Sequence, residues 1–87
     1  MERFYSHDLK CIIQQIDKRV ARNLFNEGYE IFMHPSNMRF DNMWQHPCPC
    51  SKEKSFTDNF DYLCHDFAYY NCDSERGRYI HFFVKYT

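Results

Sequence analysis

The stretch RYIHFFVKY, residues 78–86, decides the class of the fold. Successive side chains of a β-strand point to opposite faces, and here apolar residues fill every second position. One face would carry Ile80, Phe82, Val84 and Tyr86. The other face would carry Tyr79, His81, Phe83 and Lys85. This alternation, rich in aromatic residues, predicts a strand.

A stretch near the start of the chain has the spacing of a helix instead. Its apolar residues recur every three or four positions, which is typical of one buried helical face. They are Leu9, Ile12, Ile13, Ile16, Val20 and Leu24. Ser6 is suited to cap the first turn, and Gly28 is suited to end the helix. We therefore predict a helix over Ser6–Asn26.

The middle of the chain predicts strands and a loop. Tyr29–His34 has the residue types of a short strand, which Pro35 would close. Met38–Phe40 is a candidate for a second strand. Asp41–Lys54 shows no period, so we expect an ordered loop there.

A second amphipathic helix is expected over Phe56–Tyr70. Ser55 and Asp58 have the spacing of a capping box, in which two side chains bond to the backbone of the first turn. Apolar residues follow at helical spacing: Phe60, Leu63, Cys64 and Phe67. Residues 71–77 then read as a turn.

The elements in the order α-β-(β)-α-β predict a single α+β domain over residues 1–87. Both helices would pack on one face of a two- or three-stranded sheet. Aromatic residues make up 20% of the chain, so a short chain can still bury a core. The expected core residues are Ile13, Ile16, Val20, Ile31, Phe60, Leu63, Phe67, Ile80, Phe82 and Val84.

The overall charge argues against a nucleic-acid-binding protein. Eleven basic residues face twelve acidic ones, for a formal net charge of −1. Basic residues beside aromatic ones near the last strand still keep nucleic-acid or nucleotide binding as an alternative. They are Arg76, Arg78 and Lys85, with Tyr79, Phe83 and Tyr86. No apolar leader or membrane-length apolar run is found, so a cytoplasmic location is expected.

The segment NMWQHPCPC, residues 42–50, offers a second alternative, a small zinc knuckle. Zinc would need four ligands, and the candidates are His46, Cys48, Cys50 and Cys72. Cys48 and Cys50 flank a single Pro49, however, which is tighter than the usual spacing. The five cysteines are an odd number, which does not fit a complete disulfide framework. We expect reduced thiols and neither a metal nor another cofactor.

Catalysis would require an activated nucleophile. Cys48 or Cys50 could pair in space with His34, His46 or His81. No phosphate loop, nucleophile elbow or paired zinc-protease histidine accompanies them. The sequence therefore predicts a protein that is not an enzyme.

Protein binding is the remaining class, and aromatic anchors on a rigid element favour it. Trp44 lies beside two prolines, which limit the entropy lost when a loop docks. The expected partner-binding residues are Trp44, Gln45, His46, Asp58, Asp61 and Tyr69. Trp44 could equally fold back to cover the core, and this alternative stays open.

Across Gly28–Val84 the chain resembles small accessory proteins encoded by phages and mobile elements of Gram-positive and gut bacteria. The matching residues are His34-Pro35, Asn42-Met43-Trp44 with Pro47, Tyr69-Tyr70-Asn71-Cys72, Glu75, Gly77 and the aromatic last strand. The resemblance assigns no role to individual residues. It implies an inhibitor that binds a bacterial defence protein, such as a CRISPR effector nuclease, in the host cell.

Overall fold

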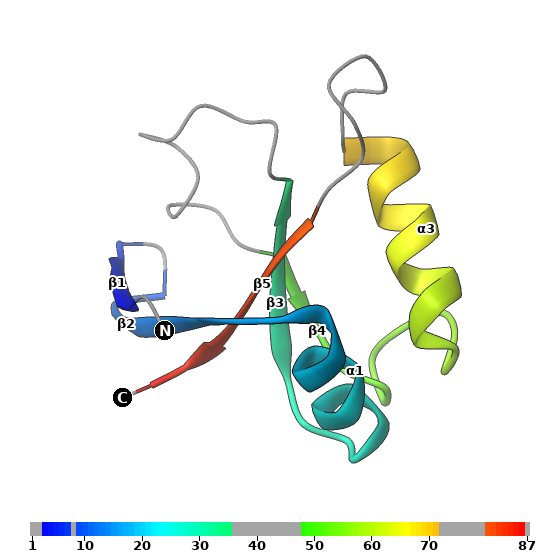
Figure 1. Cartoon of the computed structure of the whole chain (residues 1–87), viewed down its shortest axis with the longest axis horizontal. Helices are drawn as coiled ribbons and strands as arrows, with labels where there is room; N and C mark the ends of the chain where they lie inside the picture. Colours follow the sequence, from blue (N-terminus) through cyan, green and yellow to red (C-terminus); the bar gives the residue numbers. More distant parts are fainter. Residues whose placement is uncertain (1–2, 8, 36–47, 72–79, 87) are drawn as a thin grey trace.

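The computed structural model describes residues 3–7, 9–35, 48–71 and 80–86. Within these residues, five strands form one sheet, and two helices pack against it (Figure 1). In chain order they are β1 (Arg3–Ser6), β2 (Cys11–Ile16), α1 (Lys18–Asn26), β3 (Ile31–Pro35), β4 (Cys48–Cys50), α3 (Phe60–Asn71) and β5 (Ile80–Lys85). The strands are ordered β1-β2-β5-β3-β4, and every neighbouring pair is antiparallel.

The last strand, β5, occupies the centre of the sheet. Phe82 is in register with Ile16 of β2 on one side and with Met33 of β3 on the other. The alternation at residues 78–86 predicts this strand. It joins the half of the sheet formed by β1 and β2 to the half formed by β3 and β4. β5 pairs with β2 through residues 82–85 and with β3 through residues 80–83, so Phe82 and Phe83 have a strand on each side.

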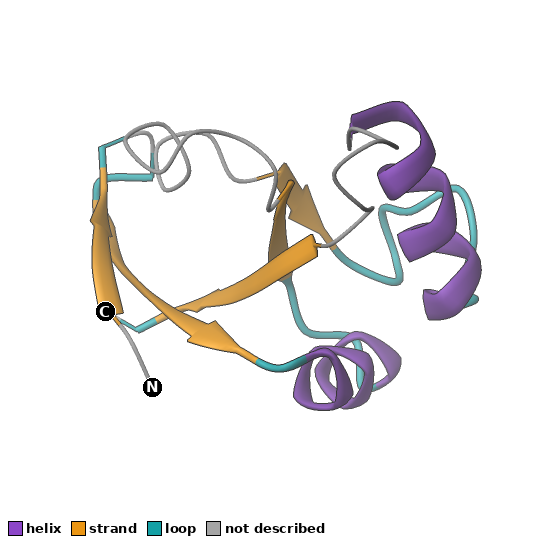
Figure 2. Cartoon of the chain, turned by 45° about the horizontal axis from the view of Figure 1, so that its top comes forward, coloured by secondary structure: helices purple, strands orange, loops and turns teal. Residues whose placement is uncertain are grey.

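One face of the sheet is covered by both helices, which lie away from β1 (Figures 1 and 2). Phe82 points to this face, where it packs against Phe60 of α3 with ring centroids 5.7 Å apart. Phe60 also contacts Phe25 of α1, at 5.4 Å. The buried residues of this cluster are Ile16, Ala21, Phe25, Ile31, Met33, Cys50, Phe60, Leu63, Cys64, Phe67 and Phe82.

The opposite face of the sheet is also apolar. Ile13, Phe32 and Phe83 form a second buried cluster there, and Phe4 packs edge-on against Phe83 at 6.4 Å. Phe83 follows Phe82 directly, so the two rings take opposite faces of β5. Seven predicted core residues are buried, whereas Val20, Ile80 and Val84 are only partly buried.

The predicted helix over Ser6–Asn26 is wrong in its first half. Arg3–Ser6 and Cys11–Ile16 are strands that pair with each other, and the helix begins only at Lys18. Ser6 caps no helix; its hydroxyl accepts from the N–H of Leu9 within the turn between β1 and β2. Lys10 has φ of 54°, a left-handed conformation that a continuous helix does not contain.

The second half of that helix, α1, has clear boundaries. Asp17 is its N-cap, and Oδ1 accepts from the N–H of Val20 at 2.8 Å. Gly28 ends it as predicted, with φ of 94°. The N–H of Tyr29 bonds back to the carbonyl of Leu24, which closes the last turn.

The second predicted helix begins later than expected. α3 starts at Phe60 rather than Phe56, and Asn59 Oδ1 accepts from the N–H of Tyr62 at 3.1 Å. The predicted capping box is wrong, because the Ser55 hydroxyl donates to the carbonyl of Ser51 instead. The residues before Phe60 form a turn.

The predicted sheet is wrong in strand number and order, although the class is α+β. β3 runs over Ile31–Pro35 rather than Tyr29–His34. β4 lies inside the segment predicted as a loop and pairs with β3, with Pro49 opposite Phe32. A proline is tolerated there because β4 is an edge strand. The candidate strand Met38–Phe40 lies outside the described residues.

Candidate functional site

Helix α3 exposes large aromatic side chains on its outer side. Tyr62, Tyr69 and Tyr70 are 56%, 59% and 75% exposed, and Phe56, just before the helix, is 66% exposed. We call these four residues the α3 face. Aromatic side chains gathered in this way mark interaction surfaces more often than single exposed ones do.

The helical period explains why these residues face outward. Phe60, Leu63, Cys64 and Phe67 are buried in the core, so the positions on the other side of the helix point away from the sheet. Tyr62 and Tyr69 are seven residues apart, which places them on the same side of α3 two turns apart. The sheet thus fixes the orientation of the exposed tyrosines.

The exposed rings pack against one another. Phe56 and Tyr62 have ring centroids 5.8 Å apart and are nearly perpendicular, at 70°. Tyr69 and Tyr70 form a similar pair, at 5.0 Å and 82°. Edge-to-face pairs of this kind restrict ring motion, so less side-chain entropy is lost when a partner binds.

Carboxylates lie beside the aromatic rings. Asp58 and Asp61 are exposed, and Asp66 is half-buried. Asp61 Oδ1 lies 2.7 Å from Nη2 of Arg22 on α1, and this hydrogen bond holds the pKa of Asp61 below its usual value. Asp58 forms no hydrogen bond or ion pair within the described residues, so its charge is available to a partner.

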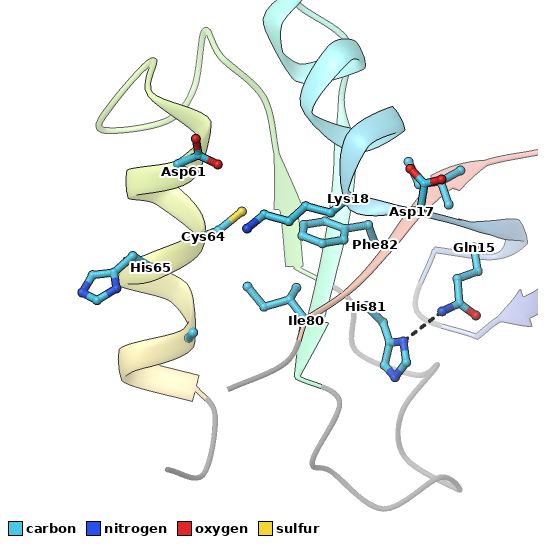
Figure 3. A pocket seen from close by; sticks show the side chains of 11 residues that line it. Gln15, Asp17, Lys18, Asp61, Cys64, His65, Ile80, His81 and Phe82 are labelled. Atoms are coloured by element: carbon cyan, nitrogen blue, oxygen red, sulfur yellow. Dashed lines mark hydrogen bonds between the residues drawn. The ribbon is translucent and has the colours of Figure 1, made fainter. Parts of the chain in front are cut away.

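A cleft of about 550 Å³ lies on the inner side of α3, where the start of α1 and the start of β5 meet it (Figure 3). Its apolar lining comes from Ile16, Cys64, Ala68, Ile80 and Phe82. Its polar lining comes from Gln15, Asp17, Lys18, Asp61, His65 and His81. Two of these polar residues contact each other, with Gln15 Nε2 2.9 Å from His81 Nδ1.

Cys48, Cys50 and Cys64 have thiol pKa values above the ordinary value. Burial raises the pKa of Cys48 and of Cys50, and it raises the pKa of Cys64 to about 11. A nucleophilic cysteine needs the opposite change. His34 is buried on β3, His81 pairs with Gln15, and His46 lies outside the described residues.

Two of the four candidate zinc ligands, His46 and Cys72, lie outside the described residues. Among the described residues, no group of three or more His, Cys, Asp or Glu is placed to hold a metal ion. Cys48 is exposed, whereas Cys50 is buried with its sulfur 3.7 Å from the Ser55 hydroxyl.

The nucleic-acid alternative loses one of its stacking residues. Phe83 is fully buried in the second cluster and cannot stack on a base. Lys85 and Tyr86 are exposed at the end of β5. The other candidates, Arg76, Arg78 and Tyr79, lie outside the described residues.

Three residues of the predicted partner-binding set are described, and all three are exposed. Asp58, Asp61 and Tyr69 are all exposed on or next to α3. Trp44, Gln45 and His46 lie outside the described residues. The prediction missed Phe56, Tyr62 and Tyr70, although their positions off the apolar stripe of the helix were a usable signal.

Comparison of the chain with protein-family models, with curated proteins and with solved structures found no match. Within the described residues, no helix is long and apolar enough to span a membrane. The surfaces of the molecule are therefore the starting point for its function.

Proposed function

We propose that this protein acts by binding another protein through the α3 face, without catalysing a reaction. The observation that carries the proposal is four aromatic side chains, each more than half exposed, on or just before a helix whose other side is fixed to the core. Tyrosine side chains are enriched among the residues that dominate binding energy. They combine a large apolar area with a polar hydroxyl.

The chemistry beside the α3 face points to a basic partner surface. Asp58, Asp61 and Asp66 would complement arginine or lysine side chains at the rim of the interface. Grooves that hold nucleic acid are basic, because they bind phosphates. A nucleic-acid-processing protein therefore suits this face.

The resemblance to phage and mobile-element accessory proteins makes the partner more specific. We propose a bacterial defence protein, such as a CRISPR effector nuclease, that is inhibited when its basic groove is covered. The protein would act in the cytoplasm of the host cell. Trp44, Gln45 and His46 remain predicted contributors to the same interface.

The experiment compares two tyrosines of equal exposure. Tyr69 on α3 and Tyr29 before β3 are each 59% exposed, so their truncation changes the solvent-exposed surface similarly. A partner is first captured from bacterial lysate, identified and purified. Tyr69→Ala should then weaken binding about tenfold or more, by the usual cost of losing an aromatic anchor.

Tyr29→Ala should leave both binding and the unfolding midpoint unchanged. Tyr69→Ala should also keep the wild-type midpoint, which separates loss of binding from loss of folding. Equal affinity of the two variants for the purified partner would refute the α3 face as the interface. Turnover of any substrate by the protein alone would refute the non-enzymatic role.

A further inference from the structure

The sheet face that carries the two helices is open at its other end. Both helices lie away from β1, so the part of this face formed by β1, β2 and the end of β5 has no helix over it (Figures 1 and 2). Tyr5 on β1 and Tyr86 just after β5 are 55% and 50% exposed. The function proposed above leaves these two rings unexplained.

The strand register places both rings in one row on this open end. Phe4 is in register with Ile13, and both belong to the second apolar cluster on the opposite face. Their neighbours Tyr5 and Ile12, also in register, therefore point to the face with the helices. The N–H of Tyr86 donates to the carbonyl of Ile12 at 2.8 Å, from the other side. Tyr5 and Tyr86 thus flank Ile12 two strand spacings apart, roughly 10 Å. We call these three residues the tyrosine row.

An arginine side chain is held over one of the two rings. The guanidinium carbon of Arg3 lies 3.8 Å from the centre of the Tyr86 ring, and its Nε donates to Oε1 of Gln14 at 3.0 Å. These two contacts fix the plane of the guanidinium. Arg3 is exposed, and its Nη groups have no acceptor within the described residues. They present N–H donors in the geometry that a phosphate group accepts.

The charges around the tyrosine row favour an anionic ligand. Among the described residues, β1, β2, the turn between them and residues 80–86 contain Arg3, Lys10 and Lys85 but no carboxylate side chain. The described carboxylates all lie between residues 17 and 71, and Glu2 and Asp8 lie outside the described residues. Lys85 points to the opposite face of the sheet, so the contact with an anionic group is assigned to Arg3.

Exposed rings beside an oriented guanidinium are suited to unpaired nucleobases. Bases stack on aromatic rings and on the planes of arginine side chains. The roughly 10 Å between Tyr5 and Tyr86 is about three times the 3.4 Å rise per base along a duplex strand. Two successive bases must therefore be unstacked to reach both positions, which a single strand permits and a duplex does not.

We propose that this open end of the sheet binds single-stranded nucleic acid. One base stacks on the Tyr5 ring, a second stacks on the Arg3 guanidinium above Tyr86, and the phosphate between them accepts from the Nη groups of Arg3. Stacking supplies most of the binding energy, which a chain with a net charge of −1 can provide. Binding is non-covalent. The α3 face shares no residue with this surface, so either proposal can fail while the other stands.

The first experiment titrates isotope-labelled protein with oligothymidylate, oligouridylate and double-stranded DNA, followed by amide chemical shifts. One or both single strands should shift the resonances of Tyr5, Ile12 and Tyr86, and should bind at least tenfold more tightly than the duplex. Equally tight binding of the duplex would overturn the proposal, as would shifts confined to other residues or no shifts at millimolar concentration. Concentration-dependent shifts of these residues in the protein alone, with a dimer in sedimentation, would instead assign the surface to a second copy.

Three tyrosine variants then test the stacking contact. Tyr5→Ala should weaken binding about tenfold, within the usual cost of losing one stacked base. Tyr5→Phe keeps the ring and should bind like the wild type. Tyr62→Ala is the matched control, because Tyr62 is 56% exposed but lies on α3. Wild-type affinity in Tyr5→Ala, or an equal loss in Tyr5→Phe, would overturn the stacking contact.

The salt dependence of binding tests the phosphate contact. Arg3→Met should make the slope of log K against log salt shallower by about 0.7, the value for one phosphate of a single strand. Arg19→Met is the matched control, because Arg19 is exposed on α1 and forms no ion pair within the described residues. Unfolding midpoints like that of the wild type establish that each variant is folded. An unchanged slope in Arg3→Met would overturn the assigned contact.

Discussion

Nη2 of Arg22 lies 2.7 Å from Oδ1 of Asp61, and this ion pair joins α1 directly to α3. The Arg22 guanidinium carbon is also 5.8 Å from the centre of the Phe60 ring. The two helices cover the same face of the sheet through a shared core, and this pair links their solvent side. It holds the start of α3 against α1, at the edge of the cleft.

The pair predicts a pH-dependent contribution to stability. Because Arg22 lowers the pKa of Asp61 in the folded state, the contribution is complete above the unfolded pKa, near 4, and is lost as the pH falls through the lower folded value. Urea unfolding of wild type and Asp61→Asn at several pH values measures this. The wild type should be more stable at neutral pH, and the difference should shrink in acid. A constant difference from neutral to acid pH would contradict it.

Phe83→Ala should destabilise the fold by about 3–5 kcal/mol, because it leaves a cavity beside Ile13 and Phe32. Phe56→Ala removes the same side chain from a position that is 66% exposed, and it should change stability far less. Thermal or urea unfolding of the two variants gives the comparison. Similar losses in both would show that the second apolar cluster is not a core.

Asp17→Ala should cost about 1 kcal/mol, since the N–H of Val20 loses its capping acceptor. Asp58→Ala is the matched control, because Asp58 has no partner within the described residues. Urea unfolding should distinguish the two substitutions. If Asp58→Ala is the more damaging, the start of α1 is not where the structure places it.

Cys48 should react with iodoacetamide much faster than Cys64, by on the order of tenfold or more at mildly alkaline pH. Cys48 is exposed, whereas Cys64 is buried with its pKa raised to about 11, so little of it is thiolate. Peptide mass spectrometry after timed quenching measures both rates. The rates should converge in denaturant. Equal rates in the folded protein would contradict the burial of Cys64.

The sequence predicted the central strand well because alternation at residues 78–86 is a local signal. It failed at Cys11–Ile16, where Ile13 and Ile16 belong to different faces of the sheet. A strand buried on both faces loses its alternation, and a spacing of three residues then imitates a helix. The β-branched side chains of Ile12 and Ile13 favoured a strand. The helical spacing of the apolar residues from Leu9 to Leu24 outweighed that preference in the prediction.

The remaining misses depend on contacts distant in sequence. β4 is three residues long and includes Pro49, so only its pairing with β3 defines it as a strand. The start of α3 was misplaced because Ser55, Asp58 and Asn59 are all good capping residues. Asn59 accepts from the N–H of Tyr62 at the start of the helix, and the Ser55 hydroxyl donates to the Ser51 carbonyl. In the candidate site, the exposure of Tyr62 follows from its position off the apolar stripe of α3, whereas that of Phe56 depends on where α3 begins.

The position of β5 has a consequence for synthesis in the cell. β2 and β3 are its two neighbours, and both precede it in the chain. While the ribosome is still adding residues before Ile80, the sheet lacks its middle strand, and Ile16 and Met33 have no Phe82 to pack against. The nascent chain must keep these apolar strands from aggregating until β5 leaves the exit tunnel.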